Sequence, residues 1–142
     1  MDFHHAGIAT EDADALAALY RDLCGCKVAH TETFDGMRVV FLDVGGCYFE
    51  LLEPIEESAE GKEGEEGEKG EEGAIASFLA DNGPGIHHLA LATEDVEATL
   101  ARARDLDIRL VDEEPREGAW GHEVAFLHPA DTGGVLLEFV TH

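Results

Sequence analysis

Positive charge is scarce in this chain. Its 142 residues include 32 Asp and Glu but only nine Lys and Arg, which gives a formal net charge of −23. A surface of this sign repels phosphate backbones, so we expect no nucleic-acid partner. The stretch 56–73 holds nine Glu and two Lys, and the other 124 residues still carry −16. Such a widespread excess is typical of proteins from salt-loving organisms, in which concentrated ions screen the repulsion.

Long apolar runs and paired cysteines are also missing. No apolar run approaches the ~18 residues that a membrane span needs. The N-terminus also lacks the basic and apolar pattern of a targeting segment, so we expect a cytoplasmic protein with no membrane partner. The three cysteines include the sequence Cys24-Gly25-Cys26, which is not a C-x-x-C pair. Neither a disulfide framework nor a zinc knuckle follows from them.

A repeat is the most informative feature that is present. Residues 3–12 read FHHAGIATED and residues 86–95 read IHHLALATED, with six of ten positions identical. Each copy predicts a strand that leads into a helix, with Thr10 and Thr93 as the N-caps. Gly25 is the expected end of the first helix. Apolar residues at helical spacing predict the buried helix faces: Leu16, Leu19, Tyr20 and Leu23 in the first copy, and Val96, Leu100 and Ala103 in the second.

Three strand-like runs follow each of these helices. They are residues 26–34, 37–44 and 47–54 in the first half, and 108–114, 122–129 and 134–140 in the second. Hairpin turns are indicated at Asp35-Gly36 and Gly45-Gly46. The sequence therefore predicts an α+β domain made of two β-α-β-β-β units, which form one curved mixed sheet and bury a shared concave face.

The predicted boundaries place the first unit at residues 1–55 and the second at 74–142. The second unit begins with a short linking helix over residues 74–83. Between the units, residues 56–73 contain only Glu, Gly and Lys after Ala59, and they offer no apolar residue to bury. We expect a flexible acidic insert there, without a part in the chemistry.

Matching positions of the two halves carry metal-ligand side chains. The first strand of each unit has a histidine pair, His4-His5 and His87-His88, and the last has a glutamate inside an apolar run, Glu50 and Glu138. Neighbours on a strand point to opposite faces, so one histidine of each pair can face the shared cavity. Two His and two Glu form an N₂O₂ set that suits a divalent transition ion.

At this point the sequence resembles the methylmalonyl-CoA epimerases of the vicinal oxygen chelate superfamily. The resemblance covers nearly the whole chain except the insert, and it rests on HHAGIAT, FELLEP, GIHHLAL, EEPREGAWG and FLHPADTGGVLLE. It implies the vicinal oxygen chelate fold and a metal held by His5, Glu50, His88 and Glu138. Co²⁺ is the expected ion, with Mn²⁺, Ni²⁺ or Zn²⁺ as alternatives. We also expect a homodimer.

The reaction implied is the interconversion of (R)- and (S)-methylmalonyl-CoA, a CoA thioester, through proton transfer at C2 and a metal-stabilised enolate. Some relatives with Gln in place of Glu50 carry a proposed catalytic Glu where Val39 stands here. We therefore expect Glu50 and Glu138 to be the catalytic pair. Ala130 stands where many relatives have Lys, so Arg116 is a candidate contact to the anionic substrate.

Trp120 stands where smaller residues are usual in the resembling family. It either lines the CoA channel or covers the edge of the core. Two other functions remain open for the chain as a whole. One is a metal-dependent lyase or isomerase like glyoxalase I, and the other is a metal-free small-molecule-binding protein. An extradiol dioxygenase is disfavoured, since it would use two His and a single carboxylate.

The charge excess generates the first prediction. Repulsion in a chain of −23 is screened over a Debye length of ~10 Å at 0.1 M salt and ~3 Å at 1 M. We expect the melting temperature, measured by calorimetry, to rise steeply between tenths molar and molar KCl. A melting temperature that does not change with KCl would contradict the halophilic interpretation.

Overall fold

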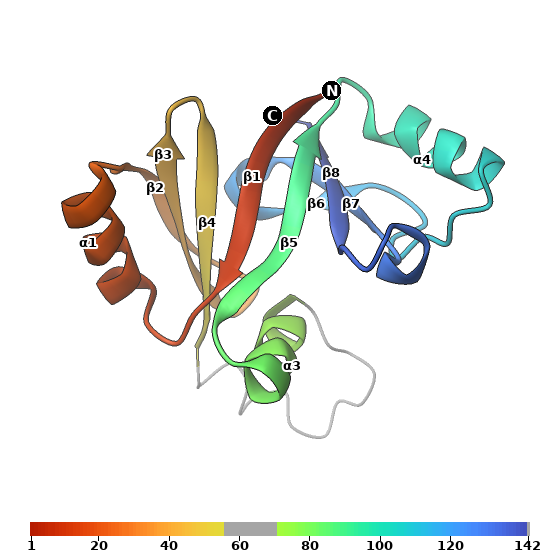
Figure 1. The fold of residues 1–142 in the computed structure, drawn as a ribbon. Coiled ribbons are helices and arrows are strands. Elements are labelled where there is room, and N and C mark those ends of the chain that lie inside the picture. Colours follow the sequence, from red (N-terminus) through yellow and green to blue (C-terminus); the bar gives the residue numbers. More distant parts are fainter. Residues whose placement is uncertain (56–70, 142) are drawn as a thin grey trace. The chain divides into compact units, whose positions relative to one another are not determined.

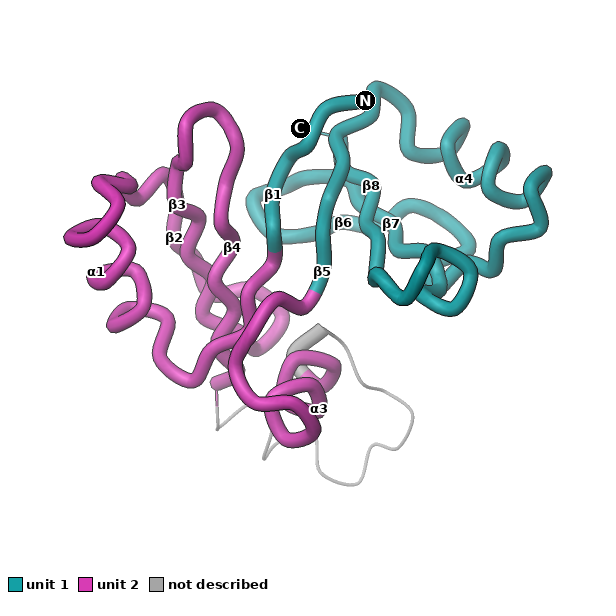
Figure 2. The backbone as a smooth tube through the Cα atoms, viewed as in Figure 1, with its two compact units in different colours: residues 1–6, 88–142 teal, residues 7–87 magenta. Residues whose placement is uncertain are grey.

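The computed structural model describes residues 1–55 and 71–141. The strands follow the hydrogen-bonded order β2-β3-β4-β1-β5-β8-β7-β6 (Figure 1). By contacts the chain divides into two compact units (Figure 2). Unit 1 comprises Met1–Ala6 and His88–His142, and unit 2 comprises Gly7–His87. Strands β1 (Asp2–Ala9) and β5 (Gly85–Ala92) contribute residues to both.

Unit 2 contains a meander of three antiparallel strands. They are β2 (Lys27–Phe34), β3 (Met37–Val44) and β4 (Cys47–Pro54). The first hairpin turns at Asp35 and Gly36, which have φ of 52° and 79°, as a primed two-residue turn requires. Helix α1 (Ala13–Cys24) packs on this sheet through a buried apolar cluster. Both predicted hairpins and the strands 37–44 and 47–54 are confirmed.

Unit 1 contains the parallel pair of the mixed sheet. Its elements include the first part of β1, the second part of β5, α4 (Val96–Asp105), β6 (Arg116–Glu117), β7 (Glu123–Leu127) and β8 (Leu137–Thr141). Strand β5 pairs with β8 in parallel, whereas β7 pairs with β8 antiparallel. The predicted stripe of α4 is confirmed, since Val96, Leu100 and Ala103 are all buried in one cluster.

The helix that precedes β5 is α3 (Glu71–Asn82), which begins three residues before the predicted start at residue 74. The predicted acidic insert lies outside the described residues except for its last three positions, which α3 includes. The domain boundaries at residues 55 and 74 stay a prediction. Within residues 1–55 and 71–141, no helix is both long enough and apolar enough to cross a bilayer.

The N-caps differ from the prediction in the same way in both helices. Asp12 caps α1 and Asp95 caps α4, and each carboxylate accepts the backbone N–H three residues later at 3.0 Å. Thr10 and Thr93 instead accept the backbone N–H of the capping Asp, at 3.2 and 3.3 Å. The Thr assignments were wrong because each Thr stands two residues before the true cap and orders the turn that leads into it. Gly25 is confirmed as the C-cap of α1, with φ 77°.

Two other predictions fail for identifiable reasons. Leu19 and Leu23 are 52% and 73% exposed, because α1 turns the face around Ala13 and Ala17 toward the sheet. The strand predicted over residues 108–114 is reduced to a single bridge at Leu110. In that segment the carboxylate of Asp112 accepts the backbone N–H of Phe126 at 2.9 Å, and a side chain therefore takes the place of a ladder hydrogen bond.

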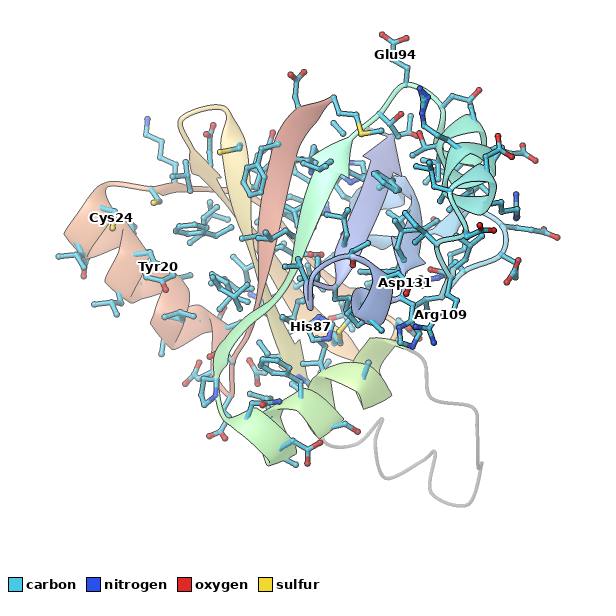
Figure 3. The ribbon with its side chains drawn as sticks, turned by 45° about the vertical axis from the view of Figure 1, so that its right-hand side comes forward. Tyr20, Cys24, His87, Glu94, Arg109 and Asp131 are labelled. Carbon is cyan, nitrogen blue, oxygen red and sulfur yellow. The ribbon has the colours of Figure 1, made fainter. Side chains whose placement is uncertain are left out.

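A bidentate ion pair fixes the segment between β7 and β8. Arg109 Nε lies 2.9 Å from Asp131 Oδ2, and its terminal nitrogen lies 3.1 Å from Oδ1. Figure 3 shows the two labelled side chains next to each other. The hydrogen bonds from Arg109 lower the pKa of Asp131 to about 2, and Asp131 raises the pKa of Arg109. The pair is exposed, so it orients this segment more than it stabilises the fold.

The cap geometry gives a matched pair of substitutions. Asp12→Ala and Asp95→Ala each remove a carboxylate that satisfies an otherwise unpaired helix N–H. We expect each to lower the free energy of unfolding by about 1 kcal/mol, measured by urea titration. Glu11→Ala is the control, because it removes an exposed carboxylate next to the same cap. An equal loss from Glu11→Ala would mean that general charge, and not capping, is responsible.

Candidate metal centre

Three buried donor atoms converge in unit 1. The Nε2 atoms of His5 and His88 lie 3.2 Å apart. The Oε1 atom of Glu138 is 3.1 Å from the first and 3.2 Å from the second. All three side chains are buried, at 2%, 4% and 5% exposure. Two imidazoles and one carboxylate therefore meet in a triangle with nearly equal sides.

The triangle has the dimensions of a metal site. Ligand atoms at about 2.1 Å from one ion are about 3.0 Å apart at a right angle and about 3.4 Å apart at the tetrahedral angle. The observed separations of 3.1 to 3.2 Å lie between these values. Within residues 1–55 and 71–141, two ring nitrogens are close to Oε1 of Glu138, but neither meets it in hydrogen-bond geometry. A buried oxygen in this situation fits coordination to a divalent transition ion.

The sheet register of unit 1 determines where two of these side chains lie. In the parallel pair of β5 and β8, Ala90 is opposite Glu138. His88 precedes Ala90 by two residues and so points to the same face as Glu138. On the other side of β8, Phe126 of β7 is opposite Glu138. The ring of Phe126 meets the ring of His88 edge to face at 5.3 Å and limits the orientations of the imidazole.

The electrostatics of Glu138 favour a bound cation. Burial raises the pKa of its carboxyl, but His88 and His5 lower it through charge and hydrogen bonding, and the net pKa is below the ordinary value. The carboxyl therefore stays ionised although it is buried. A cation between the same three side chains favours the ionised form for the same reason.

Glu50 is also buried, on β4 in unit 2. Its register partner is Phe41 of β3. The predicted set is thus brought together in part: His5, His88 and Glu138 meet in unit 1. The role of Glu50 as fourth ligand and as catalytic residue stays a prediction.

Arg116, a predicted substrate contact, lies one aromatic ring from the triad. Its guanidinium carbon is 5.6 Å from the centroid of Phe126, whose ring packs on His88. Asp112 fixes it further, since Arg116 Nε donates to Asp112 Oδ1 at 3.0 Å. The side chain of Arg116 is 36% exposed, which leaves part of the guanidinium accessible. The position supports the prediction without testing it.

Two buried histidines near the triad were missed by the sequence analysis. His4 was expected to point away from the site, but its Nδ1 lies 2.8 Å from Nδ1 of His5. His122 was not considered, and its ring lies 5.2 Å from the ring of His4. Trp120 also packs on His122, at 5.5 Å between ring centroids. The signal that could have indicated His122 is its position directly after GAWG, one of the resembling segments.

Comparison with known proteins gives a consistent result. Residues 4–126 match the family model of the Glyoxalase/Bleomycin resistance protein/Dioxygenase superfamily. The chain is 35% identical to an ethylmalonyl-CoA/methylmalonyl-CoA epimerase from Cereibacter sphaeroides, over 95% of this chain and 93% of the relative. It is 33% identical to the mitochondrial methylmalonyl-CoA epimerase of Homo sapiens, over 95% of this chain and 70% of the relative.

Solved structures agree with these relatives. A methylmalonyl-CoA epimerase variant from Streptomyces coelicolor, in complex with 2-nitronate-propionyl-CoA, has a TM-score of 0.84 and 39% identity, covering 99% of this chain and 94% of that one. The enzyme from Mycobacterium tuberculosis has a TM-score of 0.83 and 35% identity, covering 99% and 87%. This likeness confirms the predicted vicinal oxygen chelate fold with its mixed sheet. The chain belongs to the methylmalonyl-CoA epimerase family of the glyoxalase superfamily.

Proposed function

We propose that this protein is a divalent-metal-dependent epimerase that interconverts the (R) and (S) forms of methylmalonyl-CoA by moving the proton on C2. The observation that carries the proposal is the buried triangle of two imidazole nitrogens and one carboxylate oxygen, in a chain that belongs to the epimerase family. Co²⁺ is the ion we expect, and the molecule is expected to act as a homodimer.

His5, His88, Glu138 and Glu50 would hold the ion. When bound, a divalent ion would polarise the thioester carbonyl and stabilise the negative charge that develops when C2 loses its proton. The imidazoles are neutral ligands, and each carboxyl group that is ionised offsets one unit of the charge of a divalent cation. Burial of the triad keeps water away and strengthens every charge interaction at the site.

Epimerisation needs one group on each face of the planar intermediate. We assign these roles to Glu138 and Glu50, each of which would bind the ion through one oxygen and handle the proton with the other. One carboxylate removes the C2 proton from its face, and the other, initially protonated, returns a proton to the opposite face. Either enantiomer can then be substrate, since the two carboxyls exchange roles in the reverse direction.

Arg116 and Trp120 are the proposed contacts to the substrate outside the metal. The guanidinium of Arg116 is held over Phe126, next to His88, where it can pair with an anionic group of the CoA thioester. Trp120 has φ 65°, a conformation that is rare for a bulky residue. Strain of this kind clusters at functional sites, which supports a role for Trp120 in lining the CoA channel.

Removal of one imidazole from the triad tests the metal site. His5→Ala and His88→Ala should each weaken Co²⁺ binding by more than about 100-fold, because even second-shell changes cost about 10- to 100-fold. Exchange of the C2 proton of methylmalonyl-CoA with D₂O, followed by NMR, should be lost in parallel. His30→Ala, which removes a histidine of β2, is the control and should change neither.

A double variant, His5→Ala with His88→Ala, that still exchanges the substrate proton at the wild-type rate would place the active site elsewhere. Exchange in the unmodified protein also separates the candidate functions. A protein that binds Co²⁺ but does not exchange this proton would fit a lyase or isomerase like glyoxalase I. A protein with neither property would fit the metal-free binding class.

Glu50→Gln tests the assignment of the two faces. The substitution keeps an oxygen ligand of the same size, so Co²⁺ should remain bound. It removes the carboxylate that would hold a proton, and a general base is worth about 10²- to 10⁴-fold. We expect deuterium to enter one epimer through Glu138 while inversion falls by this factor. Inversion at the wild-type rate would mean that Glu50 is only a ligand.

The register of unit 2 provides a rescue for this variant. Val39 of β3 is opposite Leu52 of β4, and Phe41 is opposite Glu50, so Val39 is a diagonal neighbour of Glu50 on the same face. A carboxylate introduced by Val39→Glu into the Glu50→Gln background should restore part of the inversion. The control is Val40→Glu, whose side chain points to the opposite face of β3.

A further inference from the structure

The two histidines at the start of β1 are not independent. Neighbours on a strand normally point to opposite faces. Here His4 and His5 are both buried, at 6% and 2% exposure, and their Nδ1 atoms lie 2.8 Å apart. A hydrogen bond between these atoms requires that one of them carries the proton and that the other accepts it.

Coordination decides which histidine is the donor. Nε2 of His5 points into the triangle with His88 and Glu138, and a ligating imidazole must offer its lone pair from that atom. The single proton of neutral His5 then lies on Nδ1 and is donated to Nδ1 of His4. His4, in turn, must carry its own proton on Nε2. Metal binding at the triangle therefore implies one tautomer for each ring.

The structure also holds His4 in place. Its ring meets the ring of His122 almost perpendicularly, at 89° and 5.2 Å between centroids. His122 is buried at 6% exposure, and Trp120 packs against it. Trp120 adopts the left-handed conformation, with φ 65°, which is rare for a bulky residue, and in this conformation its ring packs against His122. The result is a buried row of three imidazoles that ends at the triad: His122, His4 and His5.

We propose that His4 is a positioning residue of the metal centre, which accepts the Nδ1–H of His5 and thereby holds His5 in the tautomer and orientation in which Nε2 binds a divalent ion. This inference rests on the metal site of the proposed function. Outer-shell acceptors of this kind orient ligating histidines in many metal proteins, and their loss costs about 10- to 100-fold in metal affinity.

The repeat supplies a natural control. His87 occupies the position in the second copy that His4 occupies in the first. Its ring packs edge to face against Phe78 of α3, at 5.2 Å between centroids. Figure 3 labels His87, which lies beside α3. His87→Phe should therefore leave the affinity for Co²⁺ unchanged, although it replaces the first histidine of a His-His pair, as His4→Phe does.

The experiment compares three replacements of His4 by titration with Co²⁺ against a competing chelator. Asn places its amide oxygen where Nδ1 stands and keeps an acceptor for His5. Gln moves its polar group one atom further, and Phe keeps a ring against His122 without any acceptor. We expect His4→Asn to bind Co²⁺ within a few-fold of wild type, and His4→Gln and His4→Phe to bind about 10- to 100-fold more weakly. The visible d–d bands of the Co²⁺ form should shift with the affinity.

Two further measurements separate positioning from packing. The melting temperatures of the metal-free variants report on packing alone. The tautomers are read directly from the ¹⁵N NMR of the imidazoles in the Zn²⁺-loaded wild type, where we expect a proton on Nδ1 of His5 and on Nε2 of His4. If His4→Phe does not fold, the comparison of His4→Asn with His4→Gln and the tautomers of the wild type still test whether His4 positions His5.

Each outcome is informative. Wild-type affinity in His4→Gln and His4→Phe, equal losses in all three variants, or the opposite tautomers would overturn the role of His4. A wild-type protein that does not bind Co²⁺ or Zn²⁺ would instead overturn the metal site itself. The two failures are therefore distinguishable, and neither depends on a measurement of epimerase activity.

Discussion

A buried carboxylate that faces two imidazole nitrogens is the constraint on which the rest of unit 1 depends. If no proton or cation lay among them, the lone pairs of these three atoms would repel one another and destabilise the fold. The surrounding structure nevertheless holds them there, through the parallel pairing of β5 with β8 and through the ring of Phe126 against His88. Such a site is preorganised for a cation, since the free-energy cost of bringing the three groups together is met by folding and not by ion binding.

Preorganisation extends beyond the atoms that touch the ion. The loop before β7 contributes Trp120 and His122, and Asp112 connects the neighbouring segment to Phe126 and Arg116. The proposed substrate contacts and the proposed support of the ligands thus come from the same short stretch of chain. On this proposal, a change in this stretch alters both the affinity for the ion and the placement of the CoA thioester.

Much of this arrangement was predictable because the sequence contains the same motif twice, at residues 3–12 and 86–95. Duplication pointed to the two histidine pairs and to Glu50 and Glu138, and the resemblance to the epimerases selected His5 and His88 from those pairs. The glycines at the turns indicated the β2–β3 and β3–β4 hairpins. The helix caps were harder to predict. In both copies Thr and Asp stand two residues apart, and the side-chain oxygen of either can accept a backbone N–H at the start of a helix.

His4 and His122 were not predictable from periodicity. Strand alternation assigns His4 to the wrong face. His122 follows a tight loop, so it belongs to no helical or strand periodicity. The strand expected over residues 108–114 is limited to one bridge, because the Asp112 carboxylate takes the N–H of Phe126, while the N–H groups of Val111 and Asp112 both donate to the carbonyl of Phe126. Side-chain hydrogen bonds that substitute for backbone pairing leave no periodic trace in a sequence.

Two of the three residues of the triad, His5 and Glu138, lie close to the two ends of the described chain. An ion bound there would act as a reversible cross-link that closes a loop spanning almost the whole chain. Loop closure restricts the unfolded state more as the loop grows, so this is close to the most effective place for such a link. Release of the ion would remove this link and leave β1 and β8 held by their neighbours in the strand order, β4 and β5 for β1, and β5 and β7 for β8. Occupancy of the site would then set catalytic competence and, at the same time, part of the free energy of unfolding.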